Sequence, residues 1–337
     1  MEKCTMDSLK IYSSSDILSL VNEREGEVKL GEKVQYASSL DNIAQSTAKF
    51  VLLGIPEDIG VRANLGIGGT QTAWMPSVKA LLNMQSNPFF TGEELLILGH
   101  LAISPPNDES LVGLRNKVAA IDDLLYPIIE RIMNANKIPI IIGGGHNNAL
   151  GIIWGASLAH NGKMNVVNID AHADLRAAEG RHSGNGFTYA LQNGYLNQYR
   201  IFGLQQNYVN ADLPKYINNN TNIRAFYYEE LLKSDRSFLQ NWQIFVKDLA
   251  EPCGLELDLD SIANVLSSAI SPSGFTLNDI RRIFLSNDKK FSYLHICEGA
   301  TQLVDERQDL TTAKTIAILV NDFIKALLPH ISQQPEA

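Results

Sequence analysis

The sequence predicts a three-layer α-β-α fold, in which helices cover both faces of a central, mostly parallel sheet. Short apolar runs alternate along its 337 residues with longer helical stretches. Such alternation is typical of parallel strands joined by helical crossovers. Hydrophobic residues make up 45% of the chain, an ordinary value for a globular protein. No internal repeat and no Pro/Ser-rich linker divides the chain, so we expect one main domain.

The predicted strands are short apolar runs that suit positions buried on both faces of a parallel sheet. Helical stretches such as 111–134 and 313–328 separate most of them. We expect residues 1–50 to form an N-terminal extension packed on the core, residues 51–330 to form the main domain, and residues 331–337 to form a flexible tail. In order, strands are predicted at residues 51–55, 95–98, 138–142, 166–169, 201–204, 254–257 and 293–296.

Two short strings of alternating polar residues follow predicted strands. Asp170, His172 and Asp174 stand two residues apart, and Asp258 and Asp260 repeat this spacing. Successive side chains of an extended chain point to opposite faces, so the members of each string can point the same way. Five acceptors at the ends of two buried strands repel one another unless a cation neutralises them. The strings therefore predict a metal site, most simply one with two ions.

A sixth candidate ligand is His146, which follows an apolar run and three glycines at 143–145. Glycines let the backbone turn sharply and bring the imidazole close to a neighbour. A phosphate-binding loop is the alternative, but no Lys-Ser/Thr pair follows the glycines. Carboxylates and imidazoles without thiolates favour manganese, iron, nickel or zinc over a structural Cys-type zinc site. Two such ions about 3.5 Å apart can turn water into a nucleophile near neutral pH.

The three motifs, in this order, resemble the metal-binding motifs of the ureohydrolases, a family that includes arginase, agmatinase, guanidinobutyrase and formimidoylglutamase. The resemblance runs from roughly residue 51 to residue 328 and implies an arginase/deacetylase-like fold with two Mn²⁺ ions per chain; Ni²⁺, Fe²⁺ and Zn²⁺ are alternatives. It implies that Asp170 and Asp258 bridge the ions and that Asp174 also passes a proton to the leaving nitrogen. One ion would be held by His146, Asp170, Asp174 and Asp258, and the other by Asp170, His172, Asp258 and Asp260.

Further segments resemble the catalytic and substrate-binding parts of the family. Glu298, after another apolar strand, resembles the glutamate that meets a cationic guanidinium or amidinium group. The segment 181–185 resembles the substrate-binding segment, so we expect Arg181, Ser183 and Asn185 to contact substrate. His182 in this segment either takes part in catalysis or only orders the loop. Arg62 and Asn64, after the first strand, are candidates for binding a substrate carboxylate, with solvated loop residues as the equal alternative.

Two departures separate the chain from arginase. Phe187 stands near the place of the histidine proposed as a proton shuttle, and residues 261–264 replace the usual Asp-Pro. The Gly-Gly-Gly-His variant and the extension at 1–50 resemble formimidoylglutamase-type members. We therefore expect hydrolysis of N-formimidoyl-L-glutamate to L-glutamate and formamide, with Arg181 and Arg62 as partners for its carboxylates. An arginase-, agmatinase- or guanidinobutyrase-like hydrolase of another guanidino compound, a one-zinc deacetylase and a non-catalytic metal-binding relative are the alternatives.

Charge and composition limit the partners and the location. A net charge of −9 argues against nucleic acid. The longest apolar runs are too short to span a membrane, and the N-terminus lacks a signal-peptide core. Three cysteines without disulfide or metal spacing fit a reducing cytoplasm. The expected partner is a small amidine or guanidino substrate, and the family resemblance implies a homo-oligomer, a trimer or hexamer. His100, His160, His295 and His330 show no pattern of their own that indicates a ligand.

Overall fold

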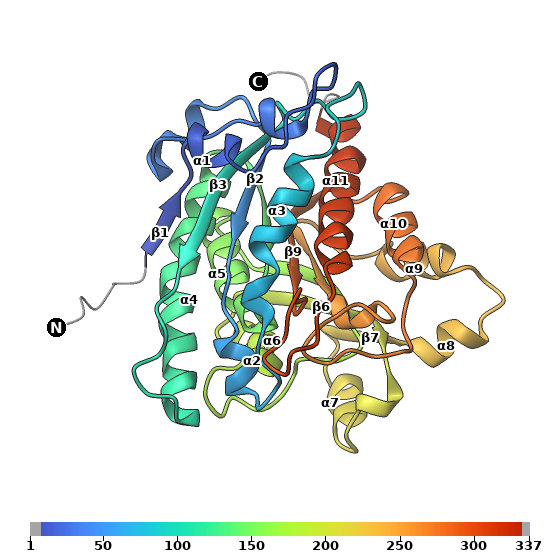
Figure 1. Cartoon of the computed structure of the whole chain (residues 1–337). Coiled ribbons are helices and arrows are strands. Elements are labelled where there is room, and N and C mark those ends of the chain that lie inside the picture. The colour runs from blue at the N-terminus through green and yellow to red at the C-terminus, as the bar shows by residue number, and fades with distance from the viewer. Residues whose placement is uncertain (1–7, 332–337) are drawn as a thin grey trace.

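The computed structural model describes residues 8–331 and has a nine-stranded sheet at its centre (Figure 1). Its strands are β1 (Ser8–Ile11), β2 (Phe50–Gly54), β3 (Leu95–Ala102), β4 (Ile138–Ile142), β5 (Met164–Ile169), β6 (Leu196–Leu204), β7 (Ile223–Tyr227), β8 (Cys253–Asp258) and β9 (Phe291–Cys297). Their order across the sheet is β1-β3-β2-β4-β9-β8-β5-β6-β7. Neighbouring strands are parallel, except that β1 runs antiparallel to β3 at one edge.

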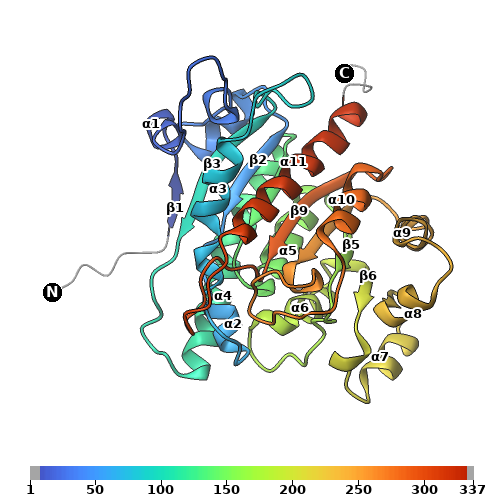
Figure 2. The same ribbon diagram turned by 45° about the vertical axis from the view of Figure 1, so that its right-hand side comes forward.

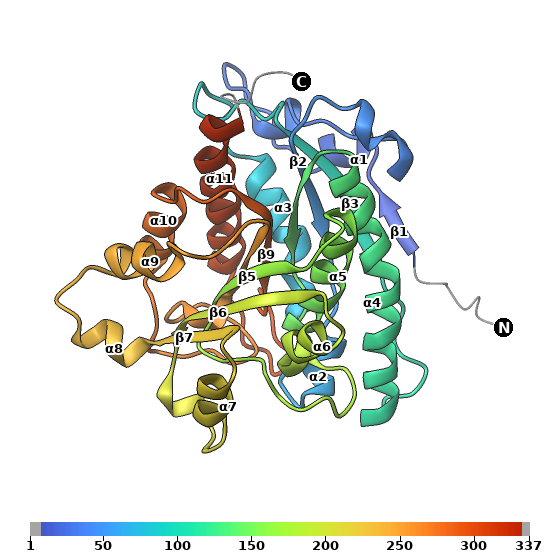
Figure 3. The ribbon, with the colours of Figure 1, turned by 180° about the vertical axis from the view of Figure 1, so that it is seen from behind.

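Helices cover both faces of this sheet, as Figures 1 and 3 show from opposite sides. They are α1 (Ser14–Leu18), α2 (Ile59–Ala63), α3 (Trp74–Leu82), α4 (Leu111–Asn134), α5 (Ala149–Ala159), α6 (Gly186–Gln192), α7 (Leu213–Asn219), α8 (Tyr228–Lys233), α9 (Phe238–Val246), α10 (Leu277–Leu285) and α11 (Thr311–Ile331). Strand residues alternate between the faces, so Leu52 joins one hydrophobic core and Leu53 the other. Helices α3 and α11 lie side by side on the first face (Figure 2) and α4 and α5 pack on the second, which confirms the predicted three-layer fold.

Every apolar run predicted as a strand overlaps a strand of the structure, and the helix predicted at 111–134 coincides with α4. The strands that sequence analysis missed are β1 and β7, which form the two edges of the sheet. Neither has the continuous buried run of the central strands: β1 is exposed or half-buried throughout, and β7 buries only Ile223 fully. An edge strand is covered less completely, so its composition carries a weaker signal.

The predicted extension at 1–50 is described from residue 8 onward. It contributes β1 to the sheet edge and buries Tyr12, Ile17 and Leu30 in one core and Ile43 in the other. The predicted boundary between this segment and the domain at 51–330 stays a prediction. The predicted tail at 331–337 lies outside the described residues beyond residue 331, where α11 ends. Among the helices within residues 8–331, none is long and apolar enough to cross a bilayer.

Four adjacent strands at the middle of the sheet, β4, β9, β8 and β5, direct the candidate site residues to one place. His146 follows β4, Asp170 follows β5, Asp258 ends β8, and Glu298 follows β9. Parallel strands bring their carboxyl ends to the same edge of a sheet, where ligands commonly bind in α/β folds. Segments more than 100 residues apart in the chain therefore meet at one cavity.

Candidate metal centre

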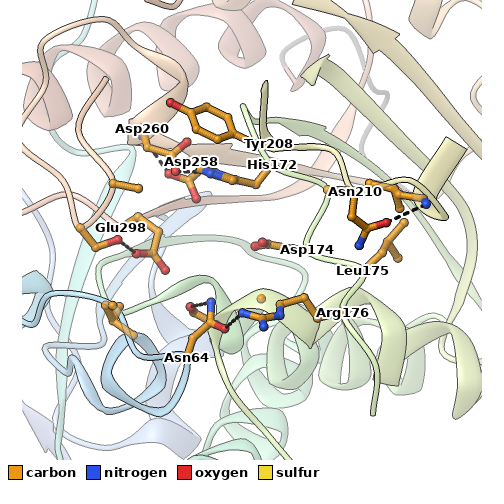
Figure 4. A pocket seen from close by; sticks show the side chains of 18 residues that line it. Asn64, His172, Asp174, Leu175, Arg176, Tyr208, Asn210, Asp258, Asp260 and Glu298 are labelled. Atoms are coloured by element: carbon orange, nitrogen blue, oxygen red, sulfur yellow. Dashed lines mark hydrogen bonds and ion pairs between the residues drawn. The ribbon is translucent and has the colours of Figure 1, made fainter. Parts of the chain in front are cut away.

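The cavity at this edge has a volume of about 450 Å³, and carboxylates and His172 line one side of it (Figure 4). His146 does not line the cavity, but it is fully buried against Asp174 and Asp258, which do. The Nδ1 atom of His146 lies 2.9 Å from Oδ2 of Asp174 and 3.3 Å from Oδ2 of both Asp170 and Asp258. These four side chains offer potential ligand atoms that all lie within 4.8 Å of one another. They form the first group of candidate ligands.

A second group surrounds His172. Its Nδ1 atom lies 2.8 Å from Oδ2 of Asp260 and 3.7 Å from Oδ1 of Asp170. The ligand atoms of His172, Asp170 and Asp260 also lie within 4.8 Å of one another. Asp170 belongs to both groups, because its two oxygens face different histidines. The six side chains predicted as ligands are thus brought together, and Asp258 belongs to the first group but not to the second.

The six side chains fit metal ions because they combine carboxylates with imidazoles and leave some of their buried polar atoms without a hydrogen-bond partner. Among the described residues, both ring nitrogens of His146 and Oδ1 of Asp260 lack a hydrogen bond. Burial and the charges of Asp260 and Asp170 raise the pKa of Asp258 well above its ordinary value. Burial and the charge of Asp170 likewise raise the pKa of Asp174. Divalent cations would remove this repulsion and satisfy Nδ1 of His146 and Oδ1 of Asp260.

Local backbone geometry holds the ligands and Glu298 in place. Asp174 and Glu298 have positive φ angles, 49° and 62°, which are uncommon outside glycine and cluster at functional sites. Glu298 is buried, and its Oε1 accepts a hydrogen bond from His146 N at 2.8 Å while its Oε2 accepts one from Ser268 Oγ at 2.5 Å. Burial raises the pKa of Glu298 to about 7. The glutamate thus faces the cavity from the turn after β9, and it is tied to the backbone of the turn after β4 that carries His146.

Two of the predicted substrate-binding residues are buried away from the cavity. Arg181 donates to both oxygens of Asp122 at 2.7 and 3.2 Å, to the carbonyl of Asn147 at 2.7 Å, and to Oδ1 of Asn185 at 2.8 Å. The side-chain nitrogen of Asn185 donates to the carbonyls of Ala177 and Gly180. All three guanidinium nitrogens are therefore engaged within the protein. This arrangement does not support Arg181 or Asn185 as substrate contacts, and assigns both to ordering the loop.

The other predicted substrate residues divide in the same way. Asn64 and Ser183 line the cavity, and the two side chains are joined by a hydrogen bond of 3.2 Å. Arg62 does not line it, because its guanidinium binds Asp58 at 2.9 Å and Glu109 at 2.5 Å. Asn64 and Ser183 thus remain available to a ligand, whereas Arg62 is held by two carboxylates outside the cavity.

His182 and Phe187 also lie outside the cavity lining. The Nδ1 atom of His182 accepts a hydrogen bond from Gly184 N at 3.2 Å, and burial lowers the pKa of this histidine to about 4. A neutral histidine that caps the turn fits the loop-ordering alternative. Phe187 is fully buried, with its ring 5.0 Å from that of His146 and 4.2 Å from that of Tyr199. It offers no proton-transfer group at this position.

Arg176 and Tyr208 are among the cavity-lining residues that sequence analysis missed (Figure 4). The guanidinium of exposed Arg176 donates to Oδ1 of Asn64 at 2.7 Å. The ring of Tyr208 lies 4.5 Å from that of His172. Arg176 continues the two-residue spacing of Asp170, His172 and Asp174, and this spacing was the available signal. Tyr208 lies in a loop far along the chain and had no such signal.

Comparison with known proteins connects this geometry to one family. The model of the arginase family matches residues 48–324. A formimidoylglutamase from Geobacillus sp. (strain WCH70) is 28% identical over 306 residues, which cover 87% of each chain. A formimidoylglutamase from Streptococcus pyogenes serotype M3 (strain MGAS315) is 30% identical over 184 residues, 52% of each chain.

Solved structures share the fold at lower identity. Trypanosoma cruzi formiminoglutamase with Mn²⁺ has a TM-score of 0.71 at 17% identity, and the match covers 92% of this chain and 100% of that one. Formimidoylglutamase from Bacillus subtilis has a TM-score of 0.72 at 16% identity, with 91% and 94% of the chains covered. These matches establish the same three-layer architecture around a central sheet.

Proposed function

The chain belongs to the arginase family, and from this premise we propose that it is a dinuclear manganese hydrolase that converts N-formimidoyl-L-glutamate to L-glutamate and formamide. The class of enzyme follows from the family: the chain is a hydrolase of C–N bonds in linear amidines. The observation that carries the substrate proposal is the presence of Arg176 and Glu298 in one cavity with the candidate metal ligands. A cation and an anion there suit the two ends of an acidic amidine.

We propose that the first group, with His146, holds one ion and that the second group, with His172, holds the other. Asp170, which faces both histidines, and Asp258 would be shared between the two. Mixed carboxylate and imidazole ligands suit manganese, with nickel, iron or zinc as alternatives. When bound, the ions would supply an activated water near neutral pH and offset the negative charge that develops during the reaction.

The chain's own residues would orient the substrate and move a proton. In the reaction, water oxygen bonds to the trigonal carbon, and the bond from that carbon to the glutamate nitrogen breaks. Buried Glu298 would hold the cationic amidine nitrogens, because its carboxylate can accept more than the two hydrogen bonds it already has. Asp174, which shares the cavity, would accept the proton of water on a carboxylate oxygen and donate it to the leaving nitrogen.

Arg176 replaces Arg181 and Arg62 as the proposed partner of the substrate carboxylate. It lines the cavity, is exposed, and within residues 8–331 donates a side-chain hydrogen bond to Asn64 alone. A guanidinium can bind a carboxylate through two parallel hydrogen bonds, which gives both strength and orientation. Asn64 and Ser183 stand beside it and can donate further hydrogen bonds. Arginine carries a second cationic group beside its carboxylate, and agmatine has no carboxylate. Both should therefore bind Arg176 less favourably than the acidic substrate does.

A substrate panel on the manganese-loaded protein tests this proposal. Formimidoylglutamate, arginine, agmatine, guanidinobutyrate and guanidine are compared, with formamide, urea and ammonia as measured products. We expect formamide from formimidoylglutamate to exceed all other products. Urea from arginine as the main product would overturn the substrate, and one metal per chain would favour the deacetylase alternative. Two bound ions without turnover of any compound would favour the non-catalytic relative.

The location and assembly of the protein belong to the same proposal. We propose a cytoplasmic homo-oligomer, a trimer or hexamer, on the strength of the family resemblance. Light scattering on the purified full chain tests the assembly directly. A monomer at micromolar concentration would contradict it without affecting the proposed chemistry.

A further inference from the structure

Behind His146, on the side away from the cavity, lies a buried carboxylate that the proposed reaction does not use. Glu256 is fully buried. Its Oε2 atom lies 2.6 Å from Nδ1 of His295 and 3.5 Å from Nε2 of His146, and its Oε1 accepts a hydrogen bond from Tyr293 Oη at 2.8 Å. One carboxylate oxygen therefore stands between two imidazole rings, whose centres are 5.9 Å apart.

The sheet explains why these residues meet. Glu256 lies on β8 two residues before Asp258, so both point to the same face of the strand. His295 is its register partner on neighbouring β9, and Tyr293 precedes His295 by two residues. The contact is thus built from strand positions rather than from a mobile loop. Sequence analysis gave His295 no role, because nothing in its own segment pairs it with Glu256.

The two nitrogens of His146 face different surroundings. Nδ1 is directed at the three carboxylates of the first group, whereas Nε2 is directed at Glu256. We propose that Glu256 is a positioning residue that keeps a proton on Nε2 of His146, so that the lone pair of Nδ1 faces the metal, and that His295 holds Glu256 in place. This inference rests on the proposed metal centre. In histidines that bind metals, the N–H group of the other ring nitrogen commonly donates a hydrogen bond to a carboxylate in this way.

A separate metal site formed by His146, His295 and Cys297 is the competing interpretation, since these three also lie within 4.8 Å of one another. Two contacts argue against it. Glu256 Oε2 already lies between the two histidines, and Cys297 Sγ donates to the carbonyl of Leu257 at 3.7 Å, as a protonated thiol does. Thiolate, and not thiol, is the form that binds metals.

The test is the affinity for manganese of each of the two proposed positions, measured on the full chain by titration. Glu256→Leu removes the acceptor at similar size, and we expect one ion to bind roughly 10- to 100-fold more weakly. The second ion should keep its wild-type affinity, since the side chains that Glu256 is shown to contact are those of His146, His295 and Tyr293. Glu256→Gln keeps an acceptor oxygen and should restore most of the lost affinity. Unchanged affinity in Glu256→Leu, or an equal loss in Glu256→Gln, would overturn the inference.

Tyr293→Phe is the matched control, because it removes a hydrogen bond from Oε1 and leaves Oε2 in place. Metal affinity within about fivefold of wild type supports the inference, because that is the size of effect that an ordinary buried hydrogen bond produces. A loss as large as that of Glu256→Leu would show that the packing of this region, rather than Oε2, governs the metal. A wild-type protein that binds no divalent cation would instead refute the proposed function itself.

A spectroscopic readout on the wild-type protein decides the matter if Glu256→Leu does not fold. Zinc is diamagnetic, so nitrogen-15 spectra of the zinc-loaded protein with labelled histidines can identify the metal-bound nitrogen of His146. We expect coordination through Nδ1 and a downfield, hydrogen-bonded proton on Nε2. Coordination through Nε2, or a rapidly exchanging Nε2 proton, would overturn the inference.

Discussion

The strand ends and the loop at residues 181–185 lie beside the same cavity but use their polar side chains in opposite ways. The strand ends gather Asp170, Asp174 and Asp258 around one nitrogen of His146, where burial and the charge of Asp170 raise the pKa of both Asp174 and Asp258. The loop pairs its buried cation, Arg181, with Asp122. A cluster of buried polar groups without hydrogen-bond partners indicates a bound ligand. A cluster whose buried polar groups are paired with one another indicates a structural role.

The largest effect should come from Asp258→Ala at the strand ends. Removal of the shared carboxylate should lower the occupancy of both ions and reduce turnover by more than roughly 100-fold, beyond what changes around a metal ligand usually produce. Metal analysis and product assays on the same sample measure the two effects. Asp41→Ala, which removes an exposed partner of Arg131, is the control and should change neither. Loss of one ion with activity retained would contradict the sharing of Asp258.

Arg181→Met tests the loop as architecture. This change leaves Asp122 buried without a cation, and breaking a buried pair in this way destabilises a protein by about 3–5 kcal/mol. Chemical denaturation measures the free energy of unfolding. Arg131→Met breaks an exposed pair with Asp41 and should change stability by only about 0–1 kcal/mol. If Arg181→Met kept the stability of the wild-type protein but had a raised KM, Arg181 would be a substrate-binding residue, as the sequence predicted.

Glu298→Gln separates substrate chemistry from metal binding. A neutral amide holds a cationic nitrogen less well, so kcat/KM should fall by roughly 100-fold. Metal content should stay at the wild-type level, because Glu298 belongs to neither ligand group. If turnover were unchanged, Glu298 would serve only to anchor the backbone of His146.

Arg176→Met should weaken binding of the acidic substrate with little effect on the metals. Loss of a charged hydrogen-bonding partner typically removes about 1.5–3 kcal/mol, so KM should rise by roughly 10-fold or more. Steady-state kinetics with formimidoylglutamate measures this change. Arg62→Met is the matched control, because Asp58 and Glu109 hold that guanidinium outside the cavity. An equal rise of KM in Arg176→Met and Arg62→Met would contradict the proposal that Arg176, and not Arg62, binds the substrate carboxylate.

The smallest effect concerns His182 and the pH dependence of stability. Its pKa is lowered from 6.5 to about 4 by burial, so between these values the unfolded chain binds a proton that the folded chain does not. Stability must therefore fall as the pH drops through this window. His182→Asn should lose less thermal stability between pH 6.5 and pH 5, by about 2–4 °C in Tm. An identical pH dependence in both proteins would show that folding does not lower the pKa of His182.

Much of the fold could be predicted because central parallel strands appear in the sequence as continuous apolar runs. The run at 138–142 coincides with β4, whose last four residues are buried, and the helix at 111–134 coincides with α4. Edge strands β1 and β7 escaped prediction because water or loops cover part of each, which permits a mixed composition. The period-two spacing of Asp170, His172 and Asp174 was equally readable in the sequence, but these residues lie beyond the end of β5 and Asp174 has a φ of 49°, so the turn after the strand sets where their side chains point.

The sequence by itself determined the type of fold, the family and the set of side chains that converge at the strand ends. Only the tertiary structure decided which arginine faces the cavity. Arg176 and Arg181 are five residues apart and chemically identical, but the carboxylate of Asp122, 59 residues away in the chain, captures Arg181 alone. The tertiary structure also placed Glu256 and His295 behind His146, through the pairing of β8 with β9. Local periodicity determines on which face of a strand a side chain lies. The function of a charged side chain depends on partners that are distant in the chain.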